Sequence, residues 1–483
     1  MSRMTQSTGL LIAQRLVSAL FGFALPIYLA NAVPSSVLGS YFLFVSSQSV
    51  LQLVATLGVG AALIKFLSGR DNPGRYLGSG IVVVTAMTVA VIVAVVVFRE
   101  QINSYIGADV WVILVGGLCL GVAANLFSTV LIGEDRIPTN ALTSIAGQLV
   151  SVPTQILVVG YGLIPLVAAY NIRFLVVLVL VIVFANTRPR MPDTETIREM
   201  TSYGARASIS NIEKQALRWT DLFVIGMFLG QSEAGIYGAI WVISKVAFIP
   251  TQALGTTIFP EISTMEGEDR TGELADLASL SLFVSLAVVL PILGGSILVG
   301  EQLLAAVYTD EYATAWLVLV IALMGRLFHT VHRIGRNVLL ALNKPSITFR
   351  VGIISVIANV VLNLVLVSQF GLIGAAAATT LSVLVGAVPF FYYVDQTTVG
   401  SIVPTRDLVD SLLATIVMMA VVFGITTTGI TTEVGLAVGV FHNAVAVAVA
   451  VGAGGVIYGL MMLAINDRTS ESARRALARA RVH

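Results

Sequence analysis

Long apolar segments constrain the fold of this chain more than any other feature. Fourteen runs follow one another, and each is long enough to cross about 30 Å of hydrocarbon. They lie near residues 9–30, 41–64, 77–98, 110–132, 140–160, 163–185, 206–229, 234–258, 278–300, 313–340, 346–368, 372–394, 408–428 and 436–464. Only 11% of the 483 residues are charged, whereas a typical soluble domain has about 25%. The sequence therefore predicts a polytopic membrane protein and excludes most soluble enzymes and nucleic-acid-binding proteins.

The spans are expected to be helices. Lipid offers no partner to unpaired backbone groups, and a transmembrane barrel would show alternating segments of about 10 residues, which this sequence lacks. Cys119 is the only cysteine, which excludes an intramolecular disulfide framework. The expected fold class is an all-α polytopic membrane protein with about 14 transmembrane helices.

The basic residues of the loops predict the orientation of the chain. Sixteen Lys and Arg residues fall in one set of alternate loops, whereas Arg99 stands alone in the other set. Cytoplasmic loops carry the excess of basic residues. We therefore expect a multi-pass protein of the cell membrane with both termini in the cytoplasm. This orientation requires an even number of spans, which agrees with fourteen.

An internal repeat predicts the domain organisation. Residues 36–41 (Ser-Val-Leu-Gly-Ser-Tyr) resemble residues 232–237 (Ser-Glu-Ala-Gly-Ile-Tyr), and the intervening chain holds six spans. An even number of spans preserves the orientation, so the repeat is parallel, with its axis along the membrane normal. The predicted parts are a six-helix lobe over 1–185, a cytoplasmic linker over 186–200, a second six-helix lobe over 201–395, and two further helices with a basic tail over 396–483.

Basic residues outnumber acidic residues inside the predicted spans. The ten basic residues are Arg15, Arg173, Arg206, Lys214, Arg218, Lys245, Arg326, Arg333, Arg336 and Arg350. Glu213 and Asp221 of the seventh span oppose them. Intramembrane charge is costly and normally faces a partner or a water-filled cavity. The surplus predicts a cavity for an anionic ligand, although snorkelling of long side chains to the interface explains Arg206 and Arg350 equally well.

The tenth span shows the clearest pattern. Arg326, His329, Arg333 and Arg336 follow one another in steps of three and four, so they share one face of a helix. Arginine suits an anion cavity because its planar fork binds phosphate oxygens in pairs and keeps its charge. The alternative is a packed polar seam or a row of arginines like that of a voltage sensor.

The seventh and first spans add further polar residues. Lys214, Arg218 and Asp221 share most of one face in the seventh span, and Arg15 lies in the first. Glu213, Asp221 and His329 are the candidates for ion pairing or for coupling to H⁺ or Na⁺. A structural Arg218–Asp221 pair and a hydrogen-bonded interior histidine are the alternatives. The predicted cavity residues are Arg15, Arg173, Lys214, Arg218, Lys245, Arg326, Arg333 and Arg336.

Motifs of enzyme chemistry are absent from the sequence. It contains no phosphate-binding loop of the G-x-x-x-x-G-K-[ST] type, no G-x-S-x-G and no H-E-x-x-H. It also lacks a His and Cys cluster with metal-ligand spacing. We therefore expect no enzymatic activity, no catalytic residue, no metal and no cofactor.

The chain resembles the Wzx-like polysaccharide or lipid-linked oligosaccharide flippases. Their superfamily also contains the lipid II flippases and the multidrug and toxin extrusion transporters. The similar segments are Arg-Trp-Thr-Asp-Leu-Phe-Val-Ile-Gly-Met-Phe-Leu-Gly at 218–230, Gly-Ile-Tyr at 235–237, Pro-Glu-Ile-Ser at 260–263, Asn-Lys-Pro at 343–345 and Gly-Leu-Ile-Gly-Ala at 371–375. The resemblance covers nearly the whole chain, in order.

The resemblance implies transport of a polyprenyl- or dolichyl-(pyro)phosphate-linked oligosaccharide from the cytoplasmic to the outer leaflet. It implies two helical bundles around a central cationic cavity, with the phosphate role carried to Arg15, Arg218, Arg326 and Arg333. The implied partners are the lipid-linked glycan, membrane lipids and glycan-assembly enzymes, and no nucleic acid. An ion-coupled multidrug or cation antiporter of the same superfamily is one alternative. A membrane glycosyltransferase or ligase acting on lipid-linked sugars is the other.

Overall fold

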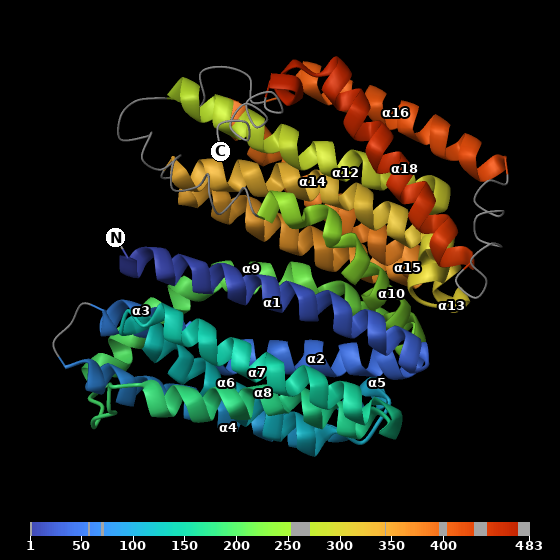
Figure 1. Ribbon diagram of the computed structural model, residues 1–483. Coiled ribbons are helices and arrows are strands. Elements are labelled where there is room, and N and C mark those ends of the chain that lie inside the picture. The colour runs from blue at the N-terminus through green and yellow to red at the C-terminus, as the bar shows by residue number, and fades with distance from the viewer. Residues whose placement is uncertain are drawn as a thin grey trace. The chain divides into compact units, whose positions relative to one another are not determined.

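The computed structural model describes residues 2–56, 58–68, 72–252, 271–342, 344–395, 403–428 and 442–471. These residues form helices joined by short connections, and they contain no strand (Figure 1). Twelve helices among them are long and apolar enough to cross a membrane. The prediction of an all-α polytopic membrane protein is therefore confirmed.

The chain divides into two compact units, Met1–Ala239 and Ile240–His483, with the boundary inside α10 (Gln231–Ser244). The first unit contains α1 (Ser2–Ala32), α2 (Ser35–Thr56), α3 (Val59–Leu67), α4 (Pro73–Val97), α5 (Arg99–Ile106), α6 (Trp111–Gly133), α7 (Ile137–Val158), η1 (Val159–Tyr161), α8 (Leu163–Phe184) and α9 (Thr194–Phe228). The second contains η2 (Val246–Phe248), α12 (Thr271–Val307), α13 (Asp310–Ala313), α14 (Trp316–Ala341), α15 (Pro345–Asp395), α16 (Thr405–Thr427) and α18 (His442–Ile465).

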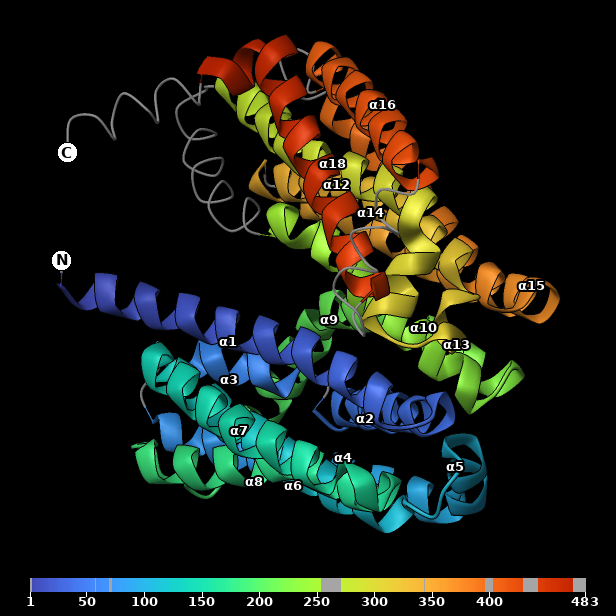
Figure 2. The ribbon, with the colours of Figure 1, turned by 45° about the vertical axis from the view of Figure 1, so that its right-hand side comes forward.

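Helices within each unit pack along their lengths. In the first unit α7 packs against α1 and α8, and α1 and α7 run side by side in both ribbon views (Figures 1 and 2). In the second unit a core forms where α12, α14 and α15 meet. Its buried side chains include Ala278, Leu339 and Phe390. This core holds α14, which carries the predicted arginine face.

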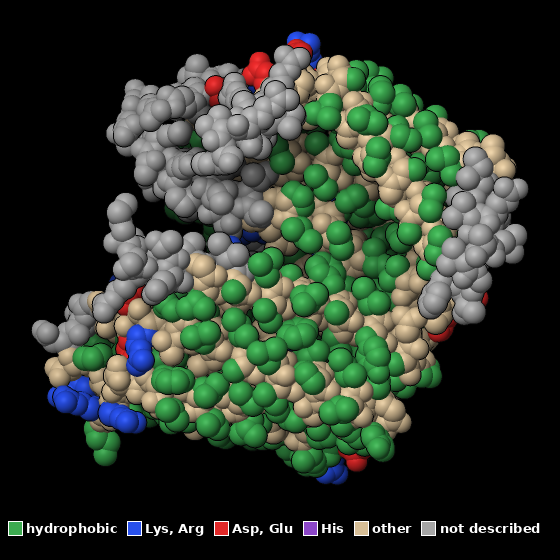
Figure 3. All heavy atoms as spheres, viewed as in Figure 1, with side chains coloured by type: hydrophobic (Ala, Val, Ile, Leu, Met, Phe, Trp, Pro, Cys, Tyr) green, Lys and Arg blue, Asp and Glu red, His purple; other side chains and the backbone are tan. Residues whose placement is uncertain are grey.

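The outward side of α4 shows how the apolar sequence meets lipid. Val82, Val89 and Val93 recur at helical spacing and are exposed, whereas Val84 and Val91 are buried. A helix that is apolar all round suits a site with protein on one side and hydrocarbon on the other. Figure 3 shows hydrophobic side chains covering the visible flanks of the helices, while Lys and Arg gather at the end of the first unit near α3.

Two glycines with positive φ interrupt the helices. One lies inside an apolar run that looks continuous in the sequence, and the other lies between two runs that look separate. The predicted span over 41–64 is divided into α2 and α3, because Gly58 adopts a left-handed φ of 74°. Gly371 has a φ of 58° inside α15, where two helices meet at a kink. Asn359 Nδ2 donates to Thr379 Oγ1 over 3.3 Å. In a straight helix these two residues would be about 30 Å apart, so α15 folds back on itself at Gly371.

The count of fourteen transmembrane helices is not confirmed, since the described residues supply twelve candidate spans. Two elements account for the difference. The charged α9 is too polar to qualify by composition, although an apolar run was expected over 206–229. The folded-back α15 is counted as one candidate span, Pro345–Val394, where two spans were expected.

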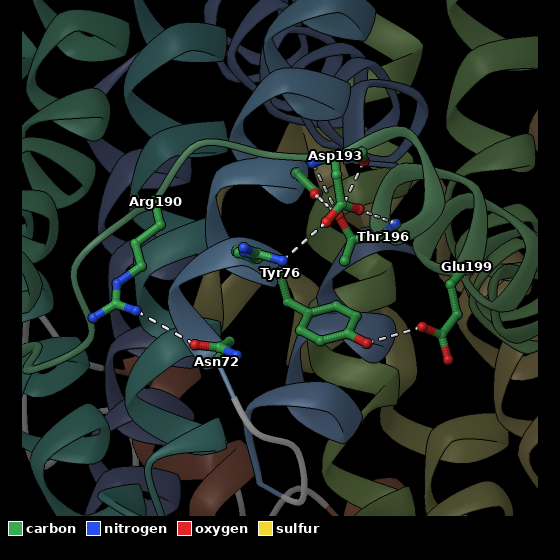
Figure 4. A network of polar contacts seen from close by, with 8 residues as sticks. Asn72, Tyr76, Arg190, Asp193, Thr196 and Glu199 are labelled. Atoms are coloured by element: carbon green, nitrogen blue, oxygen red, sulfur yellow. Dashed lines mark hydrogen bonds and ion pairs between the residues drawn. The ribbon is translucent and has the colours of Figure 1, made fainter.

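The segment before α9 is bound to the end of α4 by polar contacts (Figure 4). The Arg190 backbone N–H donates to the Gly74 carbonyl over 2.8 Å, and Tyr76 Oη donates to Glu199 Oε2 over 2.9 Å. Arg75 pairs with Asp193 over 3.4 Å. These contacts attach the predicted linker and the first turns of α9 to the first unit.

Asp193 begins α9 as its N-cap. Its Oδ1 accepts from the Thr196 backbone N–H over 2.7 Å, and Thr196 completes a capping box. This backbone hydrogen bond, assisted by the Thr196 hydroxyl and by Arg75, lowers the pKa of Asp193 below its ordinary value of 3.8. A carboxyl with a lowered pKa stabilises the folded state above that ordinary value and loses this contribution as the pH falls further.

Replacing Asp193 with alanine is expected to loosen the first turn of α9. Hydrogen exchange at the amides of residues 194–198 should become several-fold faster at neutral pH, because the cap acceptor is lost. As the pH falls below about 4, the wild type should approach the variant. Asp193→Asn is the control, since asparagine caps helices without titrating. Equal exchange in wild type and Asp193→Ala at neutral pH would contradict the capping role.

Candidate functional site: basic and aromatic clusters

Arg326 lies in α14 with only 5% of its surface exposed. Its Nη2 donates to Ser244 Oγ over 2.9 Å, and its guanidinium lies 4.0 Å from the centroid of the Trp241 ring. Both partners come from the second half of α10 and are neutral. The hydroxyl and the aromatic face orient the guanidinium.

The next residues of the predicted face lie around Phe248 of η2. The His329 ring meets Phe248 edge-on at 4.5 Å between centroids, and the Arg333 guanidinium lies 5.6 Å from the same ring. Arg333 and Arg336 are half-buried, and α14 contains no Asp or Glu. The structure thus places Arg326, His329 and Arg333 together against the η2 segment.

Lys245 lies between these elements, because it follows Ser244 and directly precedes η2. Its side chain is half-buried. The short η2 turn continues the chain after α10, so Trp241, Ser244 and Phe248 all come within reach of one face of α14. We call this group of α10, η2 and α14 side chains the Arg326 cluster.

A second cluster lies within the first unit, on α8 and α9. The Arg173 guanidinium lies 3.9 Å from the Tyr170 ring centroid and 4.3 Å from that of Phe174, and it donates to the Tyr170 hydroxyl. Arg218 stacks near the Trp219 ring at 4.8 Å. Arg218 is also within electrostatic range of Arg173 and Tyr170. Two predicted cavity residues that lie 45 positions apart in the sequence are therefore neighbours.

A buried polar network supports this Arg173 cluster. Tyr41 Oη donates to Gln155 Oε1 over 2.9 Å, and Gln155 Nε2 donates to Ser151 Oγ over 3.0 Å. The Tyr41 and Tyr170 rings meet edge-on at 5.9 Å between centroids. The polar groups of these side chains satisfy one another's hydrogen bonds inside the bundle. The network therefore holds the Tyr41 ring against Tyr170, and so fixes the position of Tyr170 and of Arg173.

The remaining predicted residues are placed differently. The Arg15 side chain, on α1, is exposed. Glu213 and Lys214 belong to α9, but their side chains lie outside the described residues. Asp221 is buried, with 3% exposure, and accepts a hydrogen bond from Tyr237 Oη over 2.6 Å. The role of each residue in binding stays a prediction.

Replacing Tyr237 with phenylalanine is expected to destabilise the first unit by about 1–3 kcal/mol, because the buried Asp221 carboxyl loses a donor. A thermal unfolding measurement on the purified protein would detect the change. Tyr161→Phe is the matched control, since Tyr161 is exposed. Unchanged stability in Tyr237→Phe would mean that the hydroxyl does not support Asp221.

The aromatic partners of the arginines were not predicted. Trp241 and Phe248 lie seven positions apart, so at helical spacing they fall on one side of the chain. Arg173 is flanked by Tyr170 three positions before it and by Phe174 one position after it. This aromatic spacing beside intramembrane arginines was the available signal. No group of His, Cys, Asp and Glu side chains suited to a metal ion occurs among the described residues.

Comparisons with known proteins agree with the fold. A family model described as "Polysaccharide biosynthesis protein" matches residues 14–317, and one described as "Lipid II flippase MurJ" matches residues 246–446. The chain is 29% identical over 423 residues to the probable low-salt glycan biosynthesis flippase Agl15 of Haloferax volcanii, covering 86% of this chain and 89% of the relative. It is 26% identical over 400 residues to the probable flippase AglR of the same organism, covering 80% of this chain and 83% of the relative.

A solved structure shares the fold. The lipid II flippase MurJ in its inward closed conformation aligns with a TM-score of 0.77 at 14% identity, covering 93% of this chain and 97% of that one. This likeness establishes a common architecture. Since the first family model spans more than half of the sequence, this multi-pass membrane protein belongs to the polysaccharide biosynthesis protein family, which confirms the resemblance drawn from its sequence.

Proposed function

We propose that this protein is a flippase that moves a polyprenyl- or dolichyl-(pyro)phosphate-linked oligosaccharide from the cytoplasmic to the outer leaflet. It is a transporter rather than an enzyme. The exported glycan would serve cell-surface polysaccharide or glycoprotein synthesis, with the glycan-assembly enzymes as partners.

The observation that carries the proposal is the buried, charged Arg326 of α14. It is held by the Trp241 ring and the Ser244 hydroxyl, and Arg333 follows two turns later on the same face. Desolvating a guanidinium costs free energy, so a chain that keeps one at membrane depth is expected to use it in an interaction that offsets this cost. Binding an anionic phosphate is such an interaction.

The relatives support the same cargo. Both Haloferax volcanii proteins are described as flippases, and one as a glycan biosynthesis flippase. A lipid-linked glycan has an anionic (pyro)phosphate, a polar sugar chain and an apolar tail. A basic, hydrated cavity would receive the first two while the tail stays in the bilayer.

The proposed cavity is lined by the basic residues predicted from the sequence. They are Arg15, Arg173, Lys214, Arg218, Lys245, Arg326, Arg333 and Arg336. Alternating access would carry the headgroup across. Glu213, Asp221 and His329 are the proposed coupling residues for H⁺ or Na⁺.

The proposed organisation has fourteen spans, with six-helix lobes over 1–185 and 201–395, the linker over 186–200 and two added helices over 396–483. Both termini are proposed to be cytoplasmic. The excess of basic residues in one set of loops supports this orientation.

The test is deletion of the gene in its host, followed by mass spectrometry of the lipid-linked sugars in each leaflet. We expect complete lipid-linked glycan to accumulate in the cytoplasmic leaflet. Wild type should rescue export, whereas Arg333→Ala should not. Arg350→Ala is the matched control, because this arginine of α15 is exposed.

The other outcomes point to the alternatives. A truncated glycan that lacks one sugar would favour a membrane glycosyltransferase or ligase. Unchanged lipid-linked sugars with new sensitivity to cationic drugs would favour a multidrug antiporter. Either result would overturn the flippase proposal.

A further inference from the structure

Arg173 lies in the middle of α8, a helix of the first unit that contains no Asp or Glu. It is ten residues beyond Leu163, the first residue of α8, which places it about 15 Å along the helix. That depth corresponds to the centre of a hydrocarbon layer about 30 Å thick. A charge at such a depth normally faces a charged partner or a water-filled cavity.

Acidic residues are missing from the helices packed against α8. These helices are α2, α6 and α7, and none of them contains an Asp or Glu. Within the described part of the chain, Arg173 forms no ion pair. Arg218 of α9 is within electrostatic range of Arg173 and adds a second positive charge. The surroundings of Arg173 therefore favour an anionic ligand over a structural ion pair.

Two aromatic rings set the orientation of the Arg173 guanidinium. The Tyr170 and Phe174 rings meet edge-on with 6.0 Å between their centroids, and the guanidinium lies close to both. Its Nη2 donates to the Tyr170 hydroxyl, whereas its Nε is buried without a hydrogen-bond partner. Buried donors are normally paired, and an exception calls for an explanation. A ligand oxygen at Nε would complete the hydrogen bonds of this side chain.

The bundle holds this group of side chains in place. Tyr170 is 6% exposed, its ring meets the Tyr41 ring edge-on, and the Tyr41 hydroxyl donates to Gln155. Arg173 and Phe174 are only half-buried. They are therefore the members of the group that a ligand can reach, and little ordering is needed when it binds.

We propose that Arg173 binds a carboxylate carried by a sugar of the transported glycan. Arg218 adds its positive charge, and the Phe174 ring packs against the sugar. The protein would then transport glycans that contain an acidic sugar in preference to neutral ones. This inference rests on the proposed function and names the class of glycan that the flippase moves.

Two features favour a sugar carboxylate over the phosphate of the lipid. A carboxylate is planar and matches the planar fork of a single guanidinium. A pyranose ring also has apolar C–H faces that suit the aromatic ring of Phe174, whereas a phosphate group has none. The proposed function places phosphate binding at Arg326 of the second unit, which leaves Arg173 for a different anion.

The test is the flipping of two synthetic lipids by the full chain in reconstituted vesicles. Both lipids carry the same polyprenyl phosphate and a disaccharide, and they differ only in the outer sugar, which is glucose in one and glucuronic acid in the other. We expect the acidic lipid to be flipped about tenfold faster, because a charge-assisted hydrogen bond is stronger than a neutral one. Equal rates for the two lipids would overturn the inference and leave the flippase intact.

Variants assign the preference to Arg173. In Arg173→Gln the ratio of acidic to neutral flipping should fall from about ten to about one, and Arg173→Lys, which keeps the charge but lacks the fork, should lie between. Arg188→Gln is the matched control, because Arg188 is exposed in the linker, and it should keep the wild-type ratio. A ratio that stays at the wild-type value in Arg173→Gln would overturn the assignment.

Calorimetry on the purified full chain distinguishes the two anions without transport. The probes are methyl glucuronide, the neutral methyl glucoside and inorganic phosphate. We expect methyl glucuronide to bind about tenfold more tightly than methyl glucoside, and Arg173→Gln to remove the difference. No binding of methyl glucuronide, or a loss of phosphate binding as large as that of glucuronide in Arg173→Gln, would overturn the carboxylate site. If Arg173→Gln does not fold, Arg173→Lys takes its place.

The two assays also separate this inference from the proposed function. Methyl glucuronide that binds through Arg173, with no flipping of either lipid, would support the carboxylate site and refute the flippase. Flipping of both lipids at equal rates, with no binding of methyl glucuronide, would refute the carboxylate site alone.

Discussion

Arg326→Ala should reduce the flipping of lipid-linked glycan by about tenfold to a hundredfold in reconstituted vesicles. Arg326 is buried, and its guanidinium contacts the Trp241 ring and the Ser244 hydroxyl. A charged hydrogen bond to phosphate contributes about 1.5–3 kcal/mol, and each 1.36 kcal/mol corresponds to a factor of ten. The expected loss in rate follows from removing one such interaction.

Stability should change much less than activity in the Arg326 variants. Removing the buried charge removes its desolvation cost, which offsets the loss of the contacts with the Ser244 hydroxyl and the Trp241 ring. Arg326→Met keeps most of the volume beside Trp241 and removes the charge. We expect this variant to unfold near the wild-type temperature and to flip as poorly as Arg326→Ala.

Arg326→Lys tests the shape of the donor group. Lysine keeps the charge but lacks the planar fork, so flipping should be intermediate. Arg350→Ala on α15 should flip normally, because its side chain is exposed. Full activity in Arg326→Met would show that the residue belongs to a packed polar seam and would contradict its role in anion binding.

The sequence predicted the helical membrane fold and the shared face of α14 because both depend on periodicity along the chain. Apolar runs identify spans, and steps of three and four place Arg326, His329 and Arg333 together. Contacts between distant segments follow no such rule. The sequence did not identify Trp241 and Phe248 as the partners of α14, since the path of η2 decides which rings reach the arginines.

Backbone breaks were only partly predictable. Gly58 divides an apolar run that reads as one span, because the left-handed φ that ends α2 leaves no trace in hydropathy. The turn at Gly371 lies between the runs over 346–368 and 372–394, which were expected as separate spans. α9 is a long helix, but its charged residues keep it from being recognised as a membrane span by composition.

The second large effect is expected at the crossing of α2 and α10, where two glycines face each other. A methyl group added at Gly39 would overlap the Gln231 carbonyl oxygen and lie 2.7 Å from the Gly235 backbone nitrogen. One added at Gly235 would overlap the Ser35 carbonyl oxygen and lie 3.0 Å from the Gly39 nitrogen. The Ser35 and Ser232 hydroxyl oxygens are 2.5 Å apart at the same place.

This contact joins the two copies of the repeated sequence motif, since Gly39 belongs to residues 36–41 and Gly235 to residues 232–237. Each glycine meets the backbone beside the other, so the close approach is reciprocal. Small residues let membrane helices approach closely and gain van der Waals and weak hydrogen-bond contacts. A side chain at either glycine must therefore force α2 and α10 apart.

Gly39→Leu should lower the stability of the protein by about 3 kcal/mol or more and abolish flipping, because overlap with rigid backbone cannot be relieved by a rotamer change. Thermal unfolding and reconstituted flipping would measure the two effects. Gly235→Leu should behave alike, and the double variant should be little worse than either, since both disrupt one crossing. Gly116→Leu on α6 is the matched control, because a Cβ there meets no atom within 4 Å. Wild-type stability in Gly39→Leu would show that the two helices do not cross at these residues.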